Sequence, residues 1–430
     1  MEKSFGVLGS SRVFLLICTA CFVSSSSVVF ASGGTWQAHM ARIAQALPVV
    51  TVRPTANGGD QTDALQAAFN ALLPGQRLVL APGTYAVSRS LNVAQANVVI
   101  SGYGATLVAS NPNDQTLVMS GRGSTLVGVT LIGTGTTRLA TRESTKVEVT
   151  GTDIQVLDVT IRGGASAGIF VYGGTNVAIV NNTVQSTLAD GIHTTYGSTN
   201  VRVEGNTVKD TGDDLIAVVS YQADGRISGN VLIDHNSVSG NYWGRGIAVV
   251  GGQSVTISNN TIDGVQKASG ILVAQEASWN TYDATNVIVS GNTVSNIQNS
   301  NVNNGLQPTQ LGALRLSAWP GTVSSVAVTN NKVSGSGYAG FQAEGNICQF
   351  SLTGDAFSSI SGVAVAVLAS GCTPTQMVVA GNTLDGVALV PPVGTSKSGL
   401  IQVSGAATAT LPTVRWSLMQ TTGSSARMRE

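Results

Sequence analysis

The feature that most constrains the fold of this chain is a repeat of short segments, each of which turns at an asparagine. Every repeat combines an alternating apolar and polar run, an asparagine turn and a second short apolar run. Seven such segments are TNVAIVNNTV (175–184), TNVRVEGNTV (199–208), VLIDHNSV (231–238), QSVTISNNTI (253–262), TNVIVSGNTV (285–294), SSVAVTNNKV (324–333) and TQMVVAGNTL (375–384). The shortest step between their asparagines is 24 residues, with no useful helical pattern between them. This step is too short for βαβ units and predicts an all-β solenoid, a single-stranded right-handed parallel β-helix.

The asparagines themselves form a column with a predicted structural role. They occupy positions 182, 206, 236, 260, 292, 331 and 382, and Asp355 takes the same place in SLTGDAF. Amides that are stacked one coil above another hydrogen-bond along the axis of a solenoid. We therefore expect a structural asparagine ladder here, not a binding site.

A second set of strand-like segments follows the asparagine turns and can be aligned coil by coil. Its first inward residues are Ile169, Ile192, Ile216, Ile247, Ile271, Leu314 and Phe341. Two residues earlier, the column reads Ala167, Asp190, Asp214, Arg245, Ser269, Gly312 and Ala339. Adjacent parallel strands lie about 4.8 Å apart. Asp190 and Asp214 should therefore meet across one rung, with Asp213 beside them.

Three carboxylates in one small patch favour chemistry over a plain turn. Their mutual repulsion raises the pKa of at least one of them. Such a cluster is costly unless it binds a cation or carries out proton transfer. The alternative is a polar turn, because Gly-Asp pairs are common in loops. The shared register of Asp190 and Asp214 favours the functional interpretation.

The chain divides into four predicted regions. Residues 1–31 are a signal peptide, 32–72 an N-terminal segment with a capping helix, 73–419 the β-helix and 420–430 a disordered tail. The helix is expected over 60–72, where Leu65, Ala68, Phe69 and Leu72 share one face and Asp60 stands at the start. It would cover the open end of the first coil.

The first residues have the features of an export signal. Lys3 and Arg12 precede an apolar run, 13–23, that is too short to span a bilayer, and a small-residue cleavage site ends at Ala31. A lipid-anchored start at Cys21 is the alternative. No later run is long and apolar enough for a membrane helix. We expect a secreted or periplasmic protein without a membrane span.

Cysteines and charge set two further expectations. Cys348 and Cys372 lie 24 residues apart, one minimal coil, so we expect them to be vertical neighbours in a disulfide. Two buried free thiols are the alternative. The chain has 22 basic and 22 acidic residues, so it has no basic field for nucleic acid. We expect a monomer.

The stretch ADGIHTTYGSTNVRVEGNTVKDTGDDLIAV (189–218) resembles the signature of polygalacturonase-type glycoside hydrolases. The segment 58–87 is similar to the wider pectate-lyase-like β-helix superfamily. The resemblance implies that Asp190, Asp213 and Asp214 are catalytic in an inverting hydrolysis of a glycosidic bond. In this scheme Asp214 is the acid, and the other two carboxylates hold the water. It implies a polysaccharide substrate and no cofactor.

Departures from the family pattern identify candidate substrate-binding residues. Arg245 stands where the family has a histidine in its GHG motif, and Arg315 resembles the family's sugar-binding arginine one coil late. We therefore expect a substrate other than homogalacturonan.

His193, on the strand after Asp190 and facing out, could replace the missing histidine or be an exposed surface residue. Tyr242 and Trp243 are either sugar-stacking platforms or loop packing. Insertions at 221–230, 275–285 and 299–311 are expected to form the walls of the binding site.

Two other functions fit the same residues. The acids could bind Ca²⁺ in a polysaccharide lyase, with Arg245 as the base. A non-catalytic glycan-binding or structural β-helix of the cell envelope is the third interpretation. Only the register of the acids argues against it.

Overall fold

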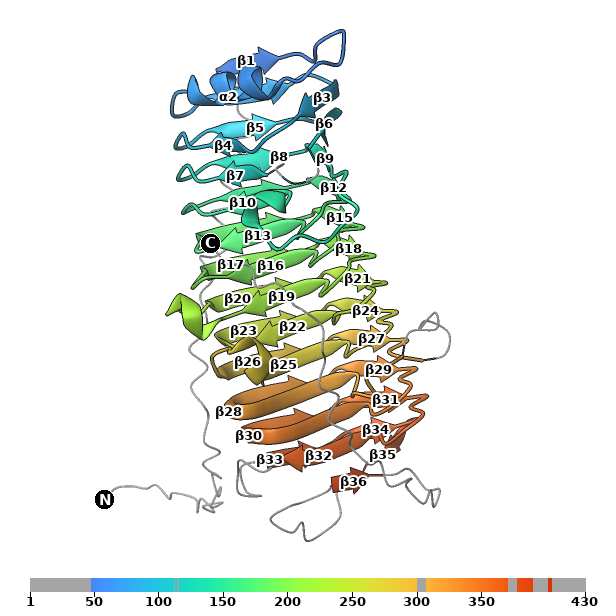
Figure 1. The fold of residues 1–430 in the computed structure, drawn as a ribbon. Coiled ribbons are helices and arrows are strands. Elements are labelled where there is room, and N and C mark those ends of the chain that lie inside the picture. The colour runs from blue at the N-terminus through green and yellow to red at the C-terminus, as the bar shows by residue number, and fades with distance from the viewer. Residues whose placement is uncertain are drawn as a thin grey trace, which may run out of the picture.

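Within its described residues, the chain folds into a right-handed parallel β-helix with one α-helix at the N-terminal end (Figure 1). The computed structural model describes residues 48–111, 113, 116–299, 307–369 and 377–389, and the backbone of 401–403. The predicted fold class is confirmed. The predicted signal peptide (1–31) and tail (420–430) lie outside the described residues and stay predictions.

Each coil has three strands, and we name the three faces of the solenoid A, B and C. Parallel pairing joins equivalent strands of successive coils, except that β36 on face A and β35 on face C pair antiparallel with β32 and β34. Face A contains β4 (Leu91–Val93), β7 (Leu117–Met119), β10 (Val147–Val149), β13 (Ile169–Tyr172), β16 (Ile192–Thr195), β19 (Ile216–Val219), β22 (Ile247–Val250), β25 (Ile271–Glu276), β32 (Val365–Ala369) and β36 (Ile401–Val403). Face B contains β1 (Val49–Val52), β2 (Arg77–Leu80), β5 (Val99–Ser101), β8 (Thr125–Val127), β11 (Gln155–Leu157), β14 (Thr175–Val180), β17 (Thr199–Glu204), β20 (Gly229–Asp234), β23 (Gly252–Ser258), β26 (Ala284–Ser290) and β33 (Met377–Ala380).

Two long strands, β28 (Leu314–Thr329) and β30 (Phe341–Thr353), run from face A around the corner onto face B. Face C contains β3 (Gly83–Val87), β6 (Ala105–Ala109), β9 (Thr130–Ile132), β12 (Thr160–Arg162), β15 (Thr183–Gln185), β18 (Thr207–Lys209), β21 (Ser237–Ser239), β24 (Thr261–Asp263), β27 (Thr293–Ser295), β29 (Lys332–Ser334), β31 (Ala356–Ser358), β34 (Thr383–Leu384) and β35 (Val387–Ala388).

The predicted register of face A is confirmed. Ile192 pairs with Ile169 and Ile216, and the column continues through the expected residues to Phe341. All of these side chains belong to one core cluster and are at most 2% exposed. Alternation of inward apolar and outward residues therefore sets the position of every strand on this face.

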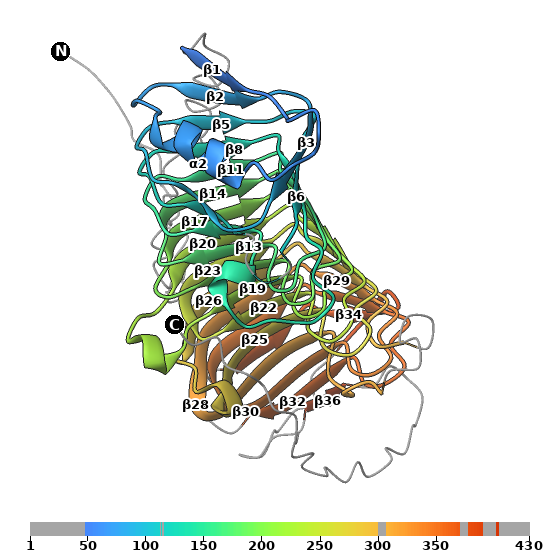
Figure 2. The ribbon, with the colours of Figure 1, turned by 45° about the horizontal axis from the view of Figure 1, so that its top comes forward.

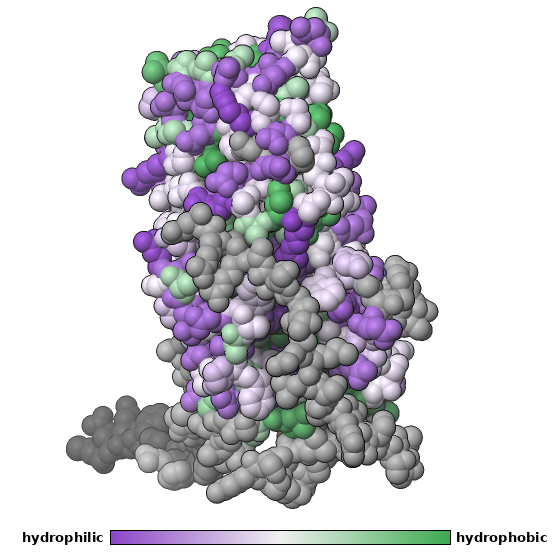
Figure 3. Space-filling model, viewed as in Figure 1, coloured by the Kyte–Doolittle hydropathy of each residue, from purple (hydrophilic) through white to green (hydrophobic). Residues whose placement is uncertain are grey.

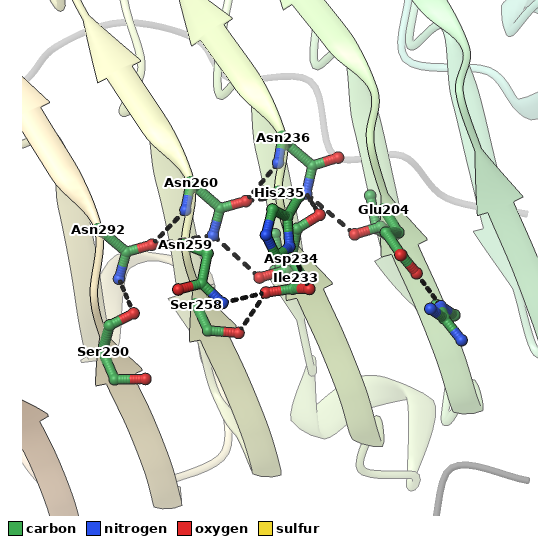
Figure 4. A network of polar contacts seen from close by, with 12 residues as sticks. Glu204, Ile233, Asp234, His235, Asn236, Ser258, Asn259, Asn260, Ser290 and Asn292 are labelled. Atoms are coloured by element: carbon green, nitrogen blue, oxygen red, sulfur yellow. Dashed lines mark hydrogen bonds and ion pairs between the residues drawn. The ribbon is translucent and has the colours of Figure 1, made fainter. Parts of the chain in front are cut away.

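The asparagine column forms the predicted ladder at the corner between faces B and C, and Figure 4 shows part of it. From Asn182 to Asn292, the backbone N–H and the amide of each asparagine both donate to the side-chain oxygen of the asparagine one coil further on; Asn236 and Asn260 are one such pair, at 2.9 Å. Each amide also donates to a backbone carbonyl, as Asn236 does to Val203. Asp355 takes part through Oδ1, which accepts from Asn331 at 2.8 Å. The ladder satisfies backbone groups that the tight corner leaves without strand partners.

The predicted capping helix is α2 (Thr62–Asn70), which lies over the first coils (Figure 2). The Asp60 carboxylate accepts hydrogen bonds from the N–H and the hydroxyl of Thr62 at the start of the helix. Leu65 and Phe69 are buried against the first coil. Because β1 pairs with β2, the first coil also includes residues that precede the helix.

Loops at the corners supply the structure around face A. The 3₁₀ turns η1 (Arg142–Ser144), η2 (Gln222–Asp224) and η3 (Ala277–Trp279) lie in three of them. The last two loops touch, since Tyr221 and Thr281 form an antiparallel bridge. The third predicted insertion, 299–311, lies partly outside the described residues.

Two surface features complete the description. In the coloured part of Figure 3, hydrophobic residues are scattered among hydrophilic ones. Within the described ranges, no helix is long and apolar enough to cross a membrane.

Candidate active site

Asp190, Asp213 and Asp214 form one cluster at the start of face A. Asp190 lies in the turn before β16, and the other two lie in the equivalent turn before β19, one coil further on. One carboxylate oxygen from each residue lies within 4.8 Å of the others. Asp214 is the most enclosed, with its side chain 7% exposed, against 14% for Asp190 and 21% for Asp213. The predicted meeting of the three acids is therefore observed.

Threonines and glycines of the turns bring the acids this close. The hydroxyl of Thr211 donates to the carbonyl of Asp213, and Thr187 makes the same bond to Ala189 one coil earlier. A Cβ on Gly212 would lie 2.3 Å from a backbone oxygen of the preceding coil. A Cβ on Gly244 would lie 2.4 Å from the backbone nitrogen of Asp214. Only glycine allows the turns to stack at this distance, which explains both glycines beside the acids.

Asp190 is held from two sides. Its Oδ1 accepts a hydrogen bond of 3.0 Å from the backbone N–H of Asp214, and its Oδ2 contacts Nδ1 of His193. His193 faces outward from the coil, as expected, yet it is only 6% exposed. The interpretation of His193 as an exposed surface residue is therefore wrong, because the ring packs 5.2 Å from that of Phe170. Its Nε2 is buried and has no partner among the described residues.

Asp213 has a partner that the sequence did not reveal. The guanidinium of Arg138 binds Oδ2 of Asp213 at 2.6 Å. Arg138 comes from the long loop between β9 and β10, 75 residues earlier in the chain. Burial and the neighbouring Asp190 raise the pKa of Asp213, whereas Arg138 and Arg245 oppose the rise. Arg138 therefore helps to keep this carboxylate ionised.

Asp214 meets Arg245, the next residue of the predicted column. Oδ1 of Asp214 accepts the backbone N–H of Arg245 at 2.6 Å, and Oδ2 lies 3.6 Å from its guanidinium. Burial raises the pKa of Asp214 well above its usual value. Arg245 lowers the pKa, but Asp213 and Asp190 add to the rise. Asp214 is thus the carboxyl of this cluster best suited to hold a proton.

Arg245 is a buried cation between two acids. Besides Asp214, its guanidinium binds Glu276 at the end of β25, a residue that sequence reasoning missed. Burial acts to lower the pKa of Arg245, but the charges of Glu276 and Asp214 outweigh it and raise the pKa. The side chain therefore stays protonated.

The other residues predicted to bind substrate are Tyr242, Trp243 and Arg315. Tyr242 and Trp243, in the turn before Arg245, are 58% and 47% exposed. Lys267 covers one face of Trp243, with its Nζ 3.5 Å from the ring centre. Arg315 lies on β28 and pairs with Glu344 of β30.

The predicted disulfide is only partly described. Cys348 lies in β30 and is disulfide-bonded. Cys372 lies outside the described residues, so the pairing of the two cysteines stays a prediction.

The cluster is a weak match to a calcium site. Ca²⁺ takes six to eight oxygen ligands. Here three carboxylates converge, and each already contacts a basic group of the chain: His193, Arg138 or Arg245. Two of the three carboxylates are already paired with arginines of the chain, and the arrangement suits proton transfer better than cation binding.

Comparisons with known proteins agree with this architecture. A family profile described as "Right handed beta helix region" matches residues 94–262 and 145–317, together more than half of the 430 residues. The chain belongs to this right-handed β-helix family. The predicted right-handed parallel β-helix fold is thereby confirmed. A comparison with curated protein sequences finds none that matches.

Several solved structures are similar over most of the chain. The catalytic unit of a GH87 α-1,3-glucanase from Streptomyces thermodiastaticus has a TM-score of 0.60 and 18% identity, covering 80% of this chain and 70% of that one. An exopolygalacturonase from Thermotoga maritima has a TM-score of 0.60 and 13% identity, covering 86% and 100%. The A-module of the mannuronan C-5 epimerase AlgE4 from Azotobacter vinelandii has a TM-score of 0.53 and 16% identity, covering 73% and 96%. At these identities the similarity concerns the fold alone.

Proposed function

We propose that this β-helix protein is a polysaccharide-cleaving glycoside hydrolase with Asp190, Asp213 and Asp214 as its catalytic residues. The observation that carries the proposal is the convergence of three carboxylates, of which Asp214 is the most buried, and burial raises its pKa. A protonated carboxylic acid beside ionised ones is the arrangement that glycosidic bond hydrolysis needs. The resemblance of 189–218 to polygalacturonase-type hydrolases points to the same residues.

The proposed roles follow from the contacts of each acid. Oδ1 of Asp214 accepts the Arg245 N–H, so Oδ2 carries the proton that passes to the leaving oxygen as the glycosidic bond breaks. Asp190 and Asp213 together hold a water, whose oxygen bonds to the anomeric carbon and whose proton they accept. Arg138 and His193, which contact these two acids, orient them.

The spacing of the acids decides how the water is placed. Inverting enzymes with two lone carboxylates separate them by about 6.5–9.5 Å, and retaining enzymes by about 5–5.5 Å. The closest oxygens of this cluster lie within 4.8 Å, so inversion requires that two acids hold the water side by side. Proton NMR of the first-formed sugar anomer tests this: inversion is expected, and retention would identify a nucleophilic carboxylate instead.

A lyase mechanism fits the geometry less well. A base must be deprotonated at the working pH, and the two acids that flank Arg245 raise the pKa of its guanidinium. The lyase alternative named from sequence therefore has its proposed base in the wrong protonation state.

The decisive experiment is a substrate screen with the Asp214→Asn variant. The purified protein is incubated with a panel of polysaccharides, and reducing ends and ultraviolet absorbance are recorded together. We expect reducing ends without absorbance, and a loss of about 10²–10⁴-fold in rate for Asp214→Asn, since the variant has no acid to protonate the leaving group. The wild-type rate should fall as pH rises through the raised pKa of Asp214.

Asp63→Asn is the matched control, because Asp63 is an exposed acid on α2, with its side chain 90% exposed. It should leave the rate unchanged. Absorbance that depends on calcium would identify a lyase. No cleavage across the panel would favour a binding or structural β-helix.

We also propose that the enzyme acts outside the cytoplasm, secreted or periplasmic, as a monomer and after removal of residues 1–31. Mass spectrometry of the exported protein checks the cleavage site, and light scattering checks the oligomeric state.

A further inference from the structure

Every described arginine on the outer side of face A near the acids is paired with a carboxylate of the same chain. Arg138 binds Asp213, Arg142 binds Glu148, Arg245 binds Asp214 and Glu276, and Arg315 binds Glu344. The acids of these pairs and Asp190 number six, against four arginines. With Asp214 protonated, as proposed above, five carboxylates stand against four arginines, and each of these arginines already has a carboxylate partner.

Other nearby cations are also engaged. Lys267 lies over Trp243, and Arg226 lies over the ring of Tyr196 at 4.8 Å. Between the coil of Asp214 and β28, the outer side of face A carries Glu276 at the end of β25 and a cluster of aliphatic side chains: Ala217, Val219, Ala248, Val250, Leu272 and Ala274. This stretch, like the paired arginines, gives no uncommitted positive charge for an acidic sugar to bind.

The guanidinium of Arg315 is held in a largely buried ion pair with Glu344. Their side chains are only 16% and 14% exposed. The second oxygen of Glu344 accepts a hydrogen bond of 3.1 Å from Gln342, and Ser317 lies 3.4 Å from the first. To bind the carboxylate of a sugar, Arg315 would have to share its guanidinium with Glu344, which would place two carboxylates against one positive charge.

We infer that the substrate is an uncharged glycan and that polyuronates are excluded. The inference rests on the proposed hydrolase function and names the substrate class of that site. A polyuronate carries a carboxylate on every sugar, and each would meet the carboxylate of Asp190 and arginines that are already paired with acids of the chain. Like charges in contact across an interface suppress a wrong partner by a large factor.

The test compares one polymer with and without charge. Neutral glucans, galactans and mannans are screened beside homogalacturonan and alginate. The best neutral substrate is then oxidised at C6 to carboxylates and assayed again. We expect kcat/KM to fall by at least about 100-fold on oxidation. Equal rates on both forms, or cleavage of a polyuronate alone, would overturn the inference while leaving the hydrolase proposal intact.

Binding is measured separately from cleavage by retardation in native gels that contain each polymer. Retardation by neutral polymers alone supports the inference even if the linkage tested is not cleaved. Retardation by polyuronates alone overturns it, and neither retardation nor cleavage by any polymer overturns both proposals.

A charge variant tests the physical cause. Glu344→Gln removes the acid that holds Arg315 and should give the protein a salt-sensitive retardation in homogalacturonan gels. Glu204→Gln is the matched control, because Glu204 pairs with Arg202 on β17 of face B with similar exposure. It should produce no such retardation. An equal response of both variants, or of neither, would contradict the role given to the Arg315 pair.

Discussion

Single residues of this β-helix depart from the repeat in informative ways, and Asp355 is the clearest case. It takes the place of an asparagine in the ladder but has no amide to donate. Its Oδ2 is buried without a partner among the described residues, where Asn331 and Asn382 each donate to a carbonyl. Burial raises the pKa of Asp355 to about 6 from a usual 3.8. Protonated Asp355 can act as a donor like an asparagine, whereas ionised Asp355 cannot.

This predicts that Asp355→Asn stabilises the protein at neutral pH. The pKa of Asp355 is higher in the folded state than in the unfolded state. The contribution of Asp355 to stability is therefore fully present below pH 3.8 and is lost as pH rises through about 6. The difference of about two pKa units corresponds to about 3 kcal/mol. Urea unfolding at pH 5 and pH 8 measures the effect: the gain should be larger at pH 8, and a gain equal at both pH values would rule out this explanation.

At the scale of strands and turns, the ladder is what closes each coil. Asn206 is 1% exposed. It accepts from the backbone and side chain of Asn182, and donates to Ile179 and Asn236. Truncation would leave several buried polar groups of neighbouring coils unpaired.

We therefore expect Asn206→Ala to lower the free energy of unfolding by about 2–4 kcal/mol. Thr261→Ala, at an exposed position of β24, is the control and should change it by less than about 0.5 kcal/mol. Equilibrium urea unfolding provides both values. A loss as small as that of the control would mean that the corner is stabilised by strand pairing alone.

The strands and turns also show which features of this protein could be predicted from its sequence. The strands, the ladder and the meeting of Asp190 with Asp214 follow from alternation and from the 24-residue step, which are periodic signals. Arg138 could not be predicted because it reaches the site from a loop outside the repeat, and Glu276 because it lies beyond the four strand residues that β19 and β22 share with β25. Burial of His193 was missed for a similar reason: it depends on neighbours such as Phe170, not on its own strand.

At the scale of the whole molecule, each coil contacts mainly its neighbours, and stability should be local along the axis. The helix α2 protects the first coil, with Phe69 only 1% exposed. Phe69→Ala should cost about 3–5 kcal/mol. Because the acids lie several coils away, the loss should be confined to the N-terminal coils and leave hydrolysis intact.

Hydrogen exchange with mass spectrometry resolves this coil by coil. Loss of protection should be greatest in peptides from β2 to β6 and absent from β16 to β22. A uniform loss along the chain would show that the solenoid unfolds as one unit.

The contact between Arg138 and Asp213 has a consequence for how such a chain can change its length. Solenoids are altered in evolution by duplication or deletion of a whole coil, and most of this molecule is built to tolerate that. The loop that carries Arg138 spans a set number of rungs before it meets Asp213. The length of this loop therefore limits the number of coils between its ends. A coil gained or lost between β9 and β19 would separate Arg138 from Asp213, whereas a coil gained beyond β25 would leave their contact intact.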